Sequence, residues 1–587
     1  MSTNATPFEA PAGSPLDPIP ASPGRASEPQ LAIDQIQGNI FPGFNKDHQT
    51  LLFLRIDNPT NFAAWLGDMS DRVATTGDVL SFNRLFKSLR RKHHGETAAV
   101  QAVWMNMAFS FAGLKMLEQP GMNLDDFVDE AFTKGLLDRA VSGELGDPVG
   151  SGTAGDPGNW VVGGDKREPH VVLLFAADDR HDLNEAVAST VRSLFPSVDA
   201  GGKVVSSGAT LLFRQDGDTL TGPLAGHEHF GFKDGISQPG VRGLLPDGSP
   251  LTPSQNALNP GQGKPGQDLL WPGEFVFGYP GQDPKKEIDE PGKDPLKNKE
   301  RKAPEFARNG SFLVFRRLRQ DVGGFHRFLG QLASQFGVAP AFVGARMVGR
   351  WPSGAAVVIS PAVDDPEQAS DDCKNNNFEF AKEKEEDDKK PPRPVALPGE
   401  VCENVTPPEH DPDGQKLPFA GHIRKAYPRN DQSSTIPSLN ESTTQTHRLL
   451  RRGIPYGPQS ASSLCAPMDD GVDRGLLFLA YQVSIVDQFE FVTKNWVNNA
   501  DFKEDGTGFD PIIGQNSADP TRRRAFKLGL PGETAPIETD QDWVVPTGGG
   551  YFFAPSIAGL KALASVKPPA KSVAGSIKKS RTHKRNK

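Results

Sequence analysis

Cysteine is scarce in this chain, since only Cys373, Cys402 and Cys465 occur among 587 residues. Their number and spacing match neither a disulfide framework nor a zinc site. A bridge between Cys373 and Cys402 would close a loop. Because we find no export signal, we expect free thiols instead, as in a reducing cytosol.

Long hydrophobic runs and a leader segment are missing as well. The longest apolar runs, such as residues 476–481, have the length of a β-strand and are too short to cross a bilayer. Residues 1–30 are rich in Pro, Ala and Ser, and they lack the basic start and the apolar stretch of a signal peptide. The sequence therefore predicts a cytoplasmic protein without membrane spans.

Positive charge is not in excess either. The formal net charge is -9, which argues against nucleic acid as a partner because nothing would offset the repulsion from phosphates. With 36% hydrophobic and 23% charged residues, the chain is globular and long enough for more than one core. A small-molecule substrate or an electron donor is easier to accommodate.

Four apolar, strand-like runs are each followed by a short polar break and an amphipathic helical pattern. They begin at Leu51, Val171, Phe312 and Leu476, two in each half of the chain. A duplicated βαβ-type unit, with helices packed on one face of an antiparallel sheet, would generate this pattern. A strand followed by a helix is also common in unrelated proteins, so a fold without duplication remains an alternative.

Composition divides the chain further. Acidic runs mixed with Asn, Lys and Pro predict a disordered insertion, and a Gly- and Pro-rich stretch at 261–272 predicts a loop; we expect catalysis in neither. The predicted organisation is a disordered segment at 1–32, two halves at 33–245 and 246–565, the insertion at about 364–412 and a basic tail at 566–587.

A carboxylate stands in the segment Gly-Phe-Lys-Asp-Gly-Ile-Ser-Gln-Pro at 231–239. Gly231 and Gly235 permit tight turns on either side of Asp234. The apolar neighbours Phe232 and Ile236 indicate a buried turn, so that the carboxylate could be fixed and aimed inward for proton transfer. The alternative is an ordinary Asp-Gly turn.

A histidine stands in a basic run. His422 is followed by Arg424, Lys425 and Arg429, a cationic neighbourhood suited to a ligand that carries carboxylates. A neutral imidazole here could be an axial ligand of iron, with its second ring nitrogen donating to a carboxylate. A surface histidine in a basic loop is the alternative.

Three arginines, at 448, 451 and 452, crowd around two leucines. If the leucines are buried, at least one arginine faces a buried anion. A competing metal site uses His227 and His229, which would share one face of a strand and could bind zinc or non-haem iron. No third ligand is obvious nearby.

At the segments around Asp234, His422 and Arg451 the chain resembles the dye-decolorising peroxidases, haem enzymes with a Gly-x-x-Asp-Gly motif. Blocks at 272–279, 309–315, 349–354 and 508–514 extend the resemblance, which is to the larger fungal-type and related bacterial members. The resemblance implies an α+β fold of the dimeric α+β barrel type: a duplicated ferredoxin-like unit, two antiparallel β-sheets with helices packed on them, and one haem b per chain between them.

The resemblance also implies residue roles. His422 would be the proximal iron ligand, Asp234 the distal acid and base, and Arg451 the distal arginine. Asp510 would pair with the proximal histidine, with Glu490 or Asp487 as substitutes. The remaining implied cofactor contacts are Arg424, as a propionate partner, and Gly235, Ile236, Ser237, Gln238, Leu476 and Phe478.

Two aromatic residues stand where the larger members of the family form surface radicals to oxidise bulky dyes. The resemblance implies this role for Tyr456 and Trp496. The plainer alternative is that both rings are partly buried packing residues.

Together these observations predict a haem peroxidase that reduces hydrogen peroxide and oxidises dyes, phenolics or other bulky aromatic donors. We expect neither nucleic acid nor membrane as a partner, and an oligomer is compatible with the sequence. The first alternative is a haem-binding or haem-handling protein, which has no use for both Asp234 and Arg451. The second is a non-haem metalloenzyme using His227 and His229, which would be colourless when purified.

Overall fold

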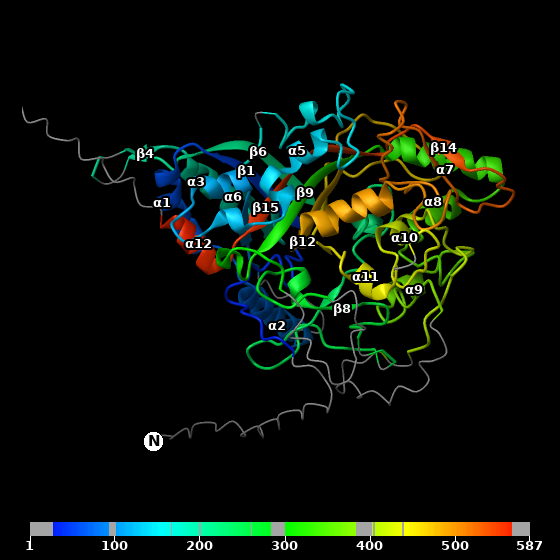
Figure 1. Ribbon diagram of the computed structural model, residues 1–587, viewed down its shortest axis with the longest axis horizontal. Coiled ribbons are helices and arrows are strands. Elements are labelled where there is room, and N and C mark those ends of the chain that lie inside the picture. The colour runs from blue at the N-terminus through cyan, green and yellow to red at the C-terminus, as the bar shows by residue number, and fades with distance from the viewer. Residues whose placement is uncertain are drawn as a thin grey trace, which may run out of the picture.

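The computed structural model describes residues 28–92, 101–165, 167–198, 201–202, 204–256, 258–259, 261–282, 300–382, 402, 405–436 and 439–565 (Figure 1). The strands are β1 (His48–Ile56), β2 (Trp104–Phe109), β3 (Val171–Ala177), β4 (Ser197–Val198), β5 (Val204–Val205), β6 (Ala209–Asp218), β7 (Gly240–Val241), β8 (Leu269–Leu270), β9 (Ser311–Gln320), β10 (Leu450–Arg451), β11 (Ile454–Tyr456), β12 (Gly475–Gln482), β13 (Arg524–Phe526), β14 (Ile537–Thr539) and β15 (Val544–Ala554).

The helices are α1 (Pro59–Ser70), α2 (Thr76–Lys92), α3 (Phe111–Met116), α4 (Glu130–Lys134), α5 (Leu136–Val141), α6 (Arg180–Leu194), α7 (Val322–Phe336), α8 (Pro340–Val348), α9 (Pro366–Ser370), α10 (His422–Ala426), α11 (Glu441–Gln445) and α12 (Ile557–Ala564). Two π-helical segments, η8 (Ile485–Glu490) and η9 (Val492–Val497), follow β12. The predicted strand and helix pairs correspond to β1 with α1, β3 with α6, β9 with α7, and β12 with η8 and η9, so all four are confirmed.

A nine-stranded antiparallel sheet organises the fold in the order β10-β12-β9-β15-β2-β3-β1-β6, with β11 also beside β12. If the strands of each half are numbered along the chain, the first half reads β6-β1-β3-β2 and the second β15-β9-β12-β10, which is the order 4-1-3-2 in both. This is the ferredoxin-like arrangement. The predicted duplication is therefore confirmed.

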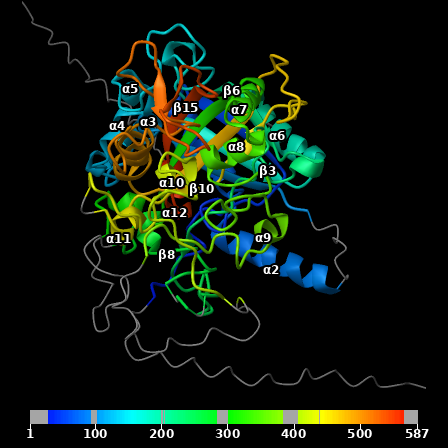
Figure 2. The same cartoon turned by 90° about the vertical axis from the view of Figure 1, so that its right-hand side faces the viewer.

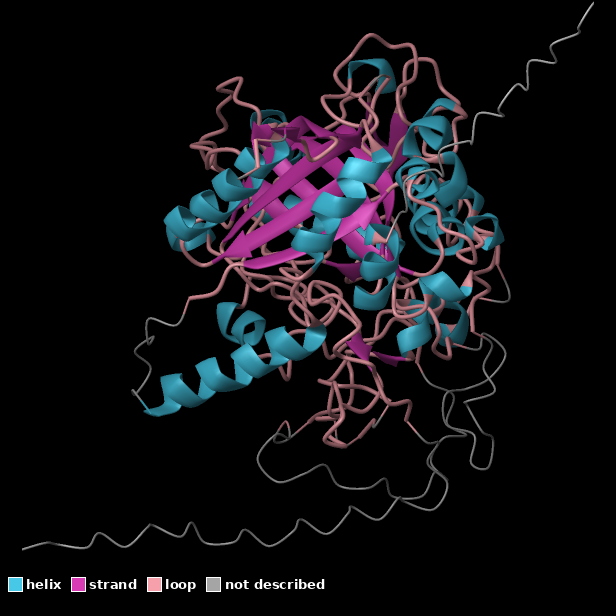
Figure 3. Cartoon of the chain, turned by 90° about the vertical axis from the view of Figure 1, so that its left-hand side faces the viewer, coloured by secondary structure: helices cyan, strands magenta, loops and turns pink. Residues whose placement is uncertain are grey.

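The two half-sheets join at both ends. Phe109 of β2 stands opposite Phe553 of β15. At the far edges, a Cβ added to Gly217 of β6 would lie 3.1 Å from the carbonyl oxygen of Pro455 in β11, so these strands are in close contact. The sheet thus curls into a barrel, which the crossing strands of Figure 3 make visible.

Alternating side chains along each strand separate the inside of the barrel from its outside. In β1, Leu51 and Phe53 belong to one buried cluster, whereas Leu52 and Leu54 belong to another. The ring of Phe53 lies 5.0 Å from that of Phe315 in β9, although three strands separate β1 from β9 in the sheet. The contact therefore crosses the barrel interior, and the interior is a packed core.

Helices cover the outside. Phe62 of α1, Leu183 of α6 and Leu560 of α12 are buried against the outward side chains of the sheet. At the other end of the molecule, α7 and α8 pack on a separate cluster around Trp543, and α10 contacts α8 and η9 (Figures 1 and 2). The space between this helical layer and the strands β9, β10 and β12 holds the candidate site.

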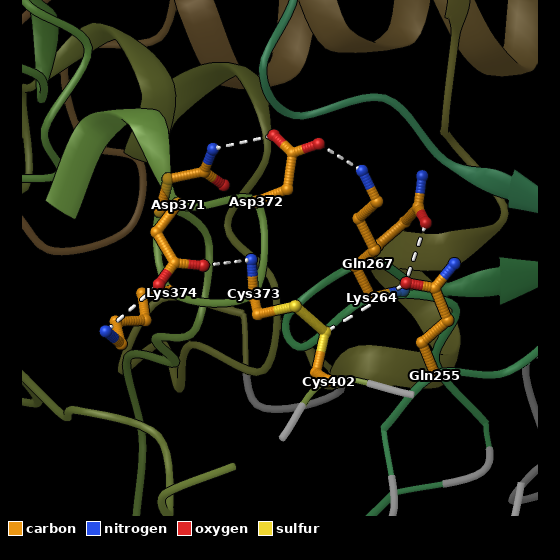
Figure 4. Close-up of a disulfide and its surroundings, with 9 residues drawn as sticks. Gln255, Lys264, Gln267, Asp371, Asp372, Cys373, Lys374 and Cys402 are labelled. Atoms are coloured by element: carbon orange, nitrogen blue, oxygen red, sulfur yellow. Dashed lines mark hydrogen bonds and ion pairs between the residues drawn. A yellow bond between two sulfur atoms is a disulfide. The ribbon is translucent and has the colours of Figure 1, made fainter. Parts of the chain in front are cut away.

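The structure corrects the prediction about thiols. Cys373 and Cys402 form a disulfide, with a sequence separation of 29 residues, and Cys465 is free and exposed (Figure 4). Composition could not reveal the pairing because it depends on two loops meeting in space. One of the two reasons for expecting a reducing cytosol is thereby removed, and the cytoplasmic location stays a prediction.

Two predictions of disorder are also wrong in part. Of the predicted insertion at 364–412, residues 364–382, 402 and 405–412 are described, and Phe378 and Phe380 are fully buried in a small core. Of the predicted amino-terminal segment, Leu31 is buried and its N–H donates to the carbonyl of Leu244. The burial of these aromatic and aliphatic side chains orders segments whose composition is otherwise polar. The predicted basic tail lies outside the described residues.

None of the helices in the described ranges is long and apolar enough to cross a membrane.

The disulfide generates a prediction. Without reductant, alkylation of the unfolded protein should label Cys465 only. Replacing both Cys373 and Cys402 by serine should lower the free energy of unfolding by about 3–4 kcal/mol, because a bridge across a loop of this length restricts the unfolded chain. Cys465→Ser is the control and should change nothing. Labelling of three cysteines without reductant would contradict the bridge.

Candidate active site

A cavity of about 350 Å³ opens between the barrel and the helical layer. Its walls combine residues from the loop after β6, from α8 and α10, from strands β9, β10 and β12 and from η8 and η9. The walls are largely apolar, with Phe230, Phe232, Leu318, Leu476, Phe478, Phe489, Val492, Val497, Ile512 and Ile513 among the lining residues. Its size and lining are typical of a cofactor or small-molecule site.

Asp234 stands on one wall, in the turn that its glycines predicted. Gly231 and Gly235 both have positive φ, at 87° and 78°. The N–H of Asp234 donates to the carbonyl of Gly226 at 3.2 Å, which closes the turn. The carboxylate faces the cavity and is 41% accessible through it.

The guanidinium of Arg451 contacts the carboxylate of Asp234. Its guanidinium Nη1 lies 3.1 Å from Oδ1 of Asp234, and the N–H of Gly235 donates to the same oxygen at 2.6 Å. Burial raises the pKa of Asp234, but the charge of Arg451 and the Gly235 N–H outweigh burial and lower it below its usual range. This shift favours the ionised form of the carboxylate.

His422 begins α10 on the opposite side of the site, and its ring lines the same cavity. Its Nδ1 lies 2.8 Å from Oδ2 of Asp510, a carboxylate without any solvent exposure. The other oxygen of Asp510 accepts the backbone N–H groups of Ile512 and Ile513. Burial lowers the pKa of His422, but Asp510 overcomes this and raises it. In the neutral ring, Nδ1 carries the hydrogen that Asp510 accepts, and Nε2 is then an electron-pair donor.

Glu490 and Asp487, the substitutes considered for Asp510, are engaged elsewhere. Glu490 pairs with Arg139 and accepts from the hydroxyl of Tyr551. Asp487 pairs with Arg301. Neither carboxylate contacts His422.

Two buried arginines, Arg350 and Arg429, line the cavity and form no ion pair with a carboxylate of the described residues, although Asp234 acts on the first over a longer distance and Asp268 on the second. Arg350 donates to the carbonyls of Gly354 and Asn375 and to Oδ1 of Asn376. Arg429 donates to the carbonyl of Phe378 and, at 2.7 Å, to the same Oδ1 of Asn376. Burial lowers the pKa of Arg350 to about 9. A bound anion would relieve the cost of holding these two charges inside.

The remaining predicted cofactor contacts divide into two groups. Gly235, Ile236, Ser237, Leu476 and Phe478 all line the cavity. Gln238 does not line it, because its side-chain amide is bonded to the backbone of Arg451. Prediction from the motif could place Gln238 near the site but not give its partner.

Arg424, predicted as a propionate partner, points away from the cavity. Its guanidinium is 1% exposed and bonds Asp431 at 2.7 Å and Asp411 at 3.2 Å. It also stacks on Phe380. Because α10 is a single short helix, His422 and Arg424 face different directions, and the prediction is wrong on this point. The sequence signal for Arg429 was its place in the same basic run, whereas Arg350 stood in the block at 349–354 without a role of its own.

Tyr456 and Trp496 are not on the surface, so the predicted surface radical sites are wrong. Trp496 is 1% exposed and stacks on Phe502. Tyr456 is 2% exposed and donates its hydroxyl to Asp473. Tyr456 packs in the barrel interior that both halves form, and Trp496 packs in a small cluster of the second half, which is the plainer alternative for both residues.

The two histidines of the competing metal site do not converge. His227 donates its Nδ1 hydrogen to the carbonyl of Ala225, whereas His229 donates from Nε2 to the carbonyl of Tyr456. Across the described ranges, no group of three or more His, Cys, Asp or Glu side chains could hold a metal ion.

The fold and the site together define a class. A duplicated ferredoxin-like unit that closes into one barrel is the architecture of the dimeric α+β barrel, and the site adds an acid and arginine pair that shares an apolar cavity with the half-buried His422. Residues 35–205 match the family model described as the DyP dimeric alpha+beta barrel domain. The match covers most of the first half-barrel.

Similarity to known proteins extends over nearly the whole chain. It is 33% identical to the dye-decolorizing peroxidase msp1 of Mycetinis scorodonius, over 96% of this chain and 94% of that protein. It is 26% identical to the multifunctional dye peroxidase DyP2 of an Amycolatopsis species, over 91% of this chain and 97% of that protein. The solved structure of a mutant of the dye-decolorizing peroxidase from Pleurotus ostreatus aligns with a TM-score of 0.69 and 30% identity, covering 92% of this chain and all of that one. The chain belongs to the dye-decolorising peroxidase family, and it is an oxidoreductase of the peroxidase class.

The position of Arg424 generates a prediction. Arg424→Met should lower the free energy of unfolding by about 3–5 kcal/mol, because Asp411 would remain buried without its cation and Asp431 would keep only Lys503. Urea unfolding of the cofactor-free protein measures this. Arg55→Met, which breaks an exposed pair with Asp57, is the control and should cost less than about 1 kcal/mol. Unchanged stability of Arg424→Met would contradict the structural role.

Proposed function

We propose that this protein is a haem peroxidase that uses hydrogen peroxide to oxidise dyes and other bulky aromatic one-electron donors, with one haem b per chain. The observation that carries the proposal is the pair of Asp234 and Arg451 on the wall of a cavity that also contains His422. The names of the relatives support dyes as donors.

The residues present fit haem. Nε2 of His422 is free to bind iron because Nδ1 is engaged by Asp510. Arg350 and Arg429 would pair with the two propionates, which supply the negative charge that these buried guanidinium groups lack. The phenylalanine, leucine and isoleucine side chains would enclose the porphyrin. When bound, haem supplies an iron that coordinates peroxide and exchanges electrons with it and with the donor.

Asp234 moves one proton. Because the pKa of Asp234 is lowered, its carboxylate is ionised and can accept the proton from one oxygen of hydrogen peroxide. Returning this proton to the second oxygen lets that oxygen leave as water when the O–O bond breaks. The carboxylate ends the step ionised, as it began, so no outside base is needed.

Arg451 has two effects on the same step. Its charge keeps Asp234 ionised, and its guanidinium stabilises the negative charge that develops on peroxide as the O–O bond lengthens. Neither effect would serve a protein that only stores or carries haem. For this reason a peroxidase accounts for the cavity better than a haem-handling protein does.

Removing the carboxylate tests the role of Asp234. Asp234→Asn should keep the haem absorption band but lose about 10²–10⁴-fold in kcat/KM for peroxide, the usual contribution of a positioned acid and base. Asp247→Asn, in an exposed Asp-Gly turn bonded to Ser249, is the matched control and should behave like the unaltered protein. Unchanged peroxide turnover in Asp234→Asn would refute the assignment.

Removing the arginine tests whether the charge of Arg451 lowers the pKa of Asp234. Asp234 must be ionised to act, so activity falls as pH drops through its pKa. Because Arg451 lowers that pKa, Arg451→Leu should raise it and move the acid limb of kcat/KM for peroxide to higher pH. Arg451→Lys keeps the charge and should leave the limb closer to its original place. If the acid limb of kcat/KM stays at the same pH in Arg451→Leu, the proposed effect of Arg451 on the pKa of Asp234 is contradicted.

A further inference from the structure

Arg451 lies on an edge strand of the sheet. Its strand, β10, has only two residues, lies at the end of the sheet and pairs with β12 on one side only. The side chain of arginine has several rotatable bonds, so a guanidinium can be aimed only if its backbone is fixed. The other edge of β10 must therefore be held by something besides a strand.

Gln238 occupies that edge. Its Oε1 accepts the N–H of Arg451 at 3.2 Å, and its Nε2 donates to the carbonyl of Arg451 at 3.1 Å. The side-chain amide thus pairs with the peptide of Arg451 as a neighbouring strand would. Arg452 adds a hydrogen bond to the same carbonyl from its own side chain.

The backbone of Gln238 is itself anchored. Its carbonyl accepts from Nε2 of Gln267 at 3.1 Å. Two residues further, the N–H of Gly240 donates to the carbonyl of Asp268, where β7 pairs with β8. Asp234 and Gln238 lie in one loop, so a single rigid segment carries both the carboxylate and the clamp on the arginine that faces it.

We propose that Gln238 is a positioning residue that sets the guanidinium of Arg451 against Asp234. Gln238 does not line the cavity, so it acts on the chemistry only through the arginine. The inference rests on the function proposed above, because it assigns Gln238 to the same peroxide step.

Four charged groups act on Asp234. Arg451 and His422 lower its pKa. Arg350 interacts with both Asp234 and Arg451, and Glu228 of the same loop interacts with Asp234. Of these, Gln238 is bonded only to Arg451, so a change in Gln238 should reach Asp234 through that arginine.

The test replaces the amide without changing the length of the side chain. In the haem-loaded enzyme, Gln238→Met should lower kcat/KM for peroxide about 5- to 10-fold and move its acid limb to higher pH, in the direction of Arg451→Leu, with KM for the dye unchanged. Added to Arg451→Leu, it should have no further effect, because interacting residues are not additive. Fluoride affinity, measured at equilibrium by absorption, should weaken in both single variants, since fluoride senses the cationic charge in the cavity without turnover.

The chain offers a matched control. Gln37 pairs in the same way with the peptide of Met107 in β2, at 2.9 Å for both hydrogen bonds, and lines no part of the cavity. Gln37→Met should therefore cost stability but leave the acid limb and fluoride affinity unchanged. If Gln238→Met does not fold, Gln238→Asn replaces it, because an amide one methylene shorter cannot reach both groups of the peptide.

The outcomes are distinguishable. A limb that stays in place in the Gln238 variant but moves in Arg451→Leu would overturn the positioning role alone. Additive effects of the two substitutions would also overturn that role and leave the proposed function intact. A limb that moves in neither variant would overturn the proposed function of the pair of Asp234 and Arg451 as well.

Discussion

The hydrogen bond between His422 and Asp510 is the interaction on which the rest of the site depends. Asp510 is fully buried, and one of its oxygens accepts hydrogen bonds from two backbone N–H groups. These bonds fix the orientation of the carboxylate, so that its other oxygen faces Nδ1 of His422. It fixes which nitrogen of His422 carries the proton and leaves the other nitrogen for a metal. Without a group held there, the pair of Asp234 and Arg451 would face an empty apolar cavity.

The fold explains how these residues meet. The two half-barrels share one strand order, yet they contribute unequally: the loop after β6 brings Asp234, while α10 and β10 of the second half bring His422 and Arg451. Asp234 lies in a loop, His422 begins the short helix α10, and Arg451 lies in the two-residue edge strand β10. The cavity that these three residues line is outside the packed interior of the barrel.

Local sequence signals were sufficient for the elements and for the residues whose role depends on their own segment. The four strand and helix pairs follow from periodicity, and the glycines around Asp234 do adopt the positive φ that a tight turn needs. Residues whose role depends on a distant partner were not predictable in this way. Arg424 and Arg429 stand in one basic run. Arg424 forms ion pairs with Asp411 and Asp431, whereas Arg429 lines the cavity.

The burial of aromatic rings and the pairing of cysteines also depend on distant segments and could not be predicted from local sequence. Nothing in the segments around Tyr456 and Trp496 reveals that other elements cover both rings, and the bridge from Cys373 to Cys402 needs two loops to meet. Resemblance to a family supplied Asp510, which lies 88 positions from His422, where local pattern could not.

A crystal structure of the purified, coloured protein, with an anomalous difference map recorded at the iron absorption edge, tests the central claim most directly. We predict a single strong peak in the cavity, within bonding distance of Nε2 of His422 and on the side that faces Asp234. A peak elsewhere, or iron bound through another side chain, would contradict it.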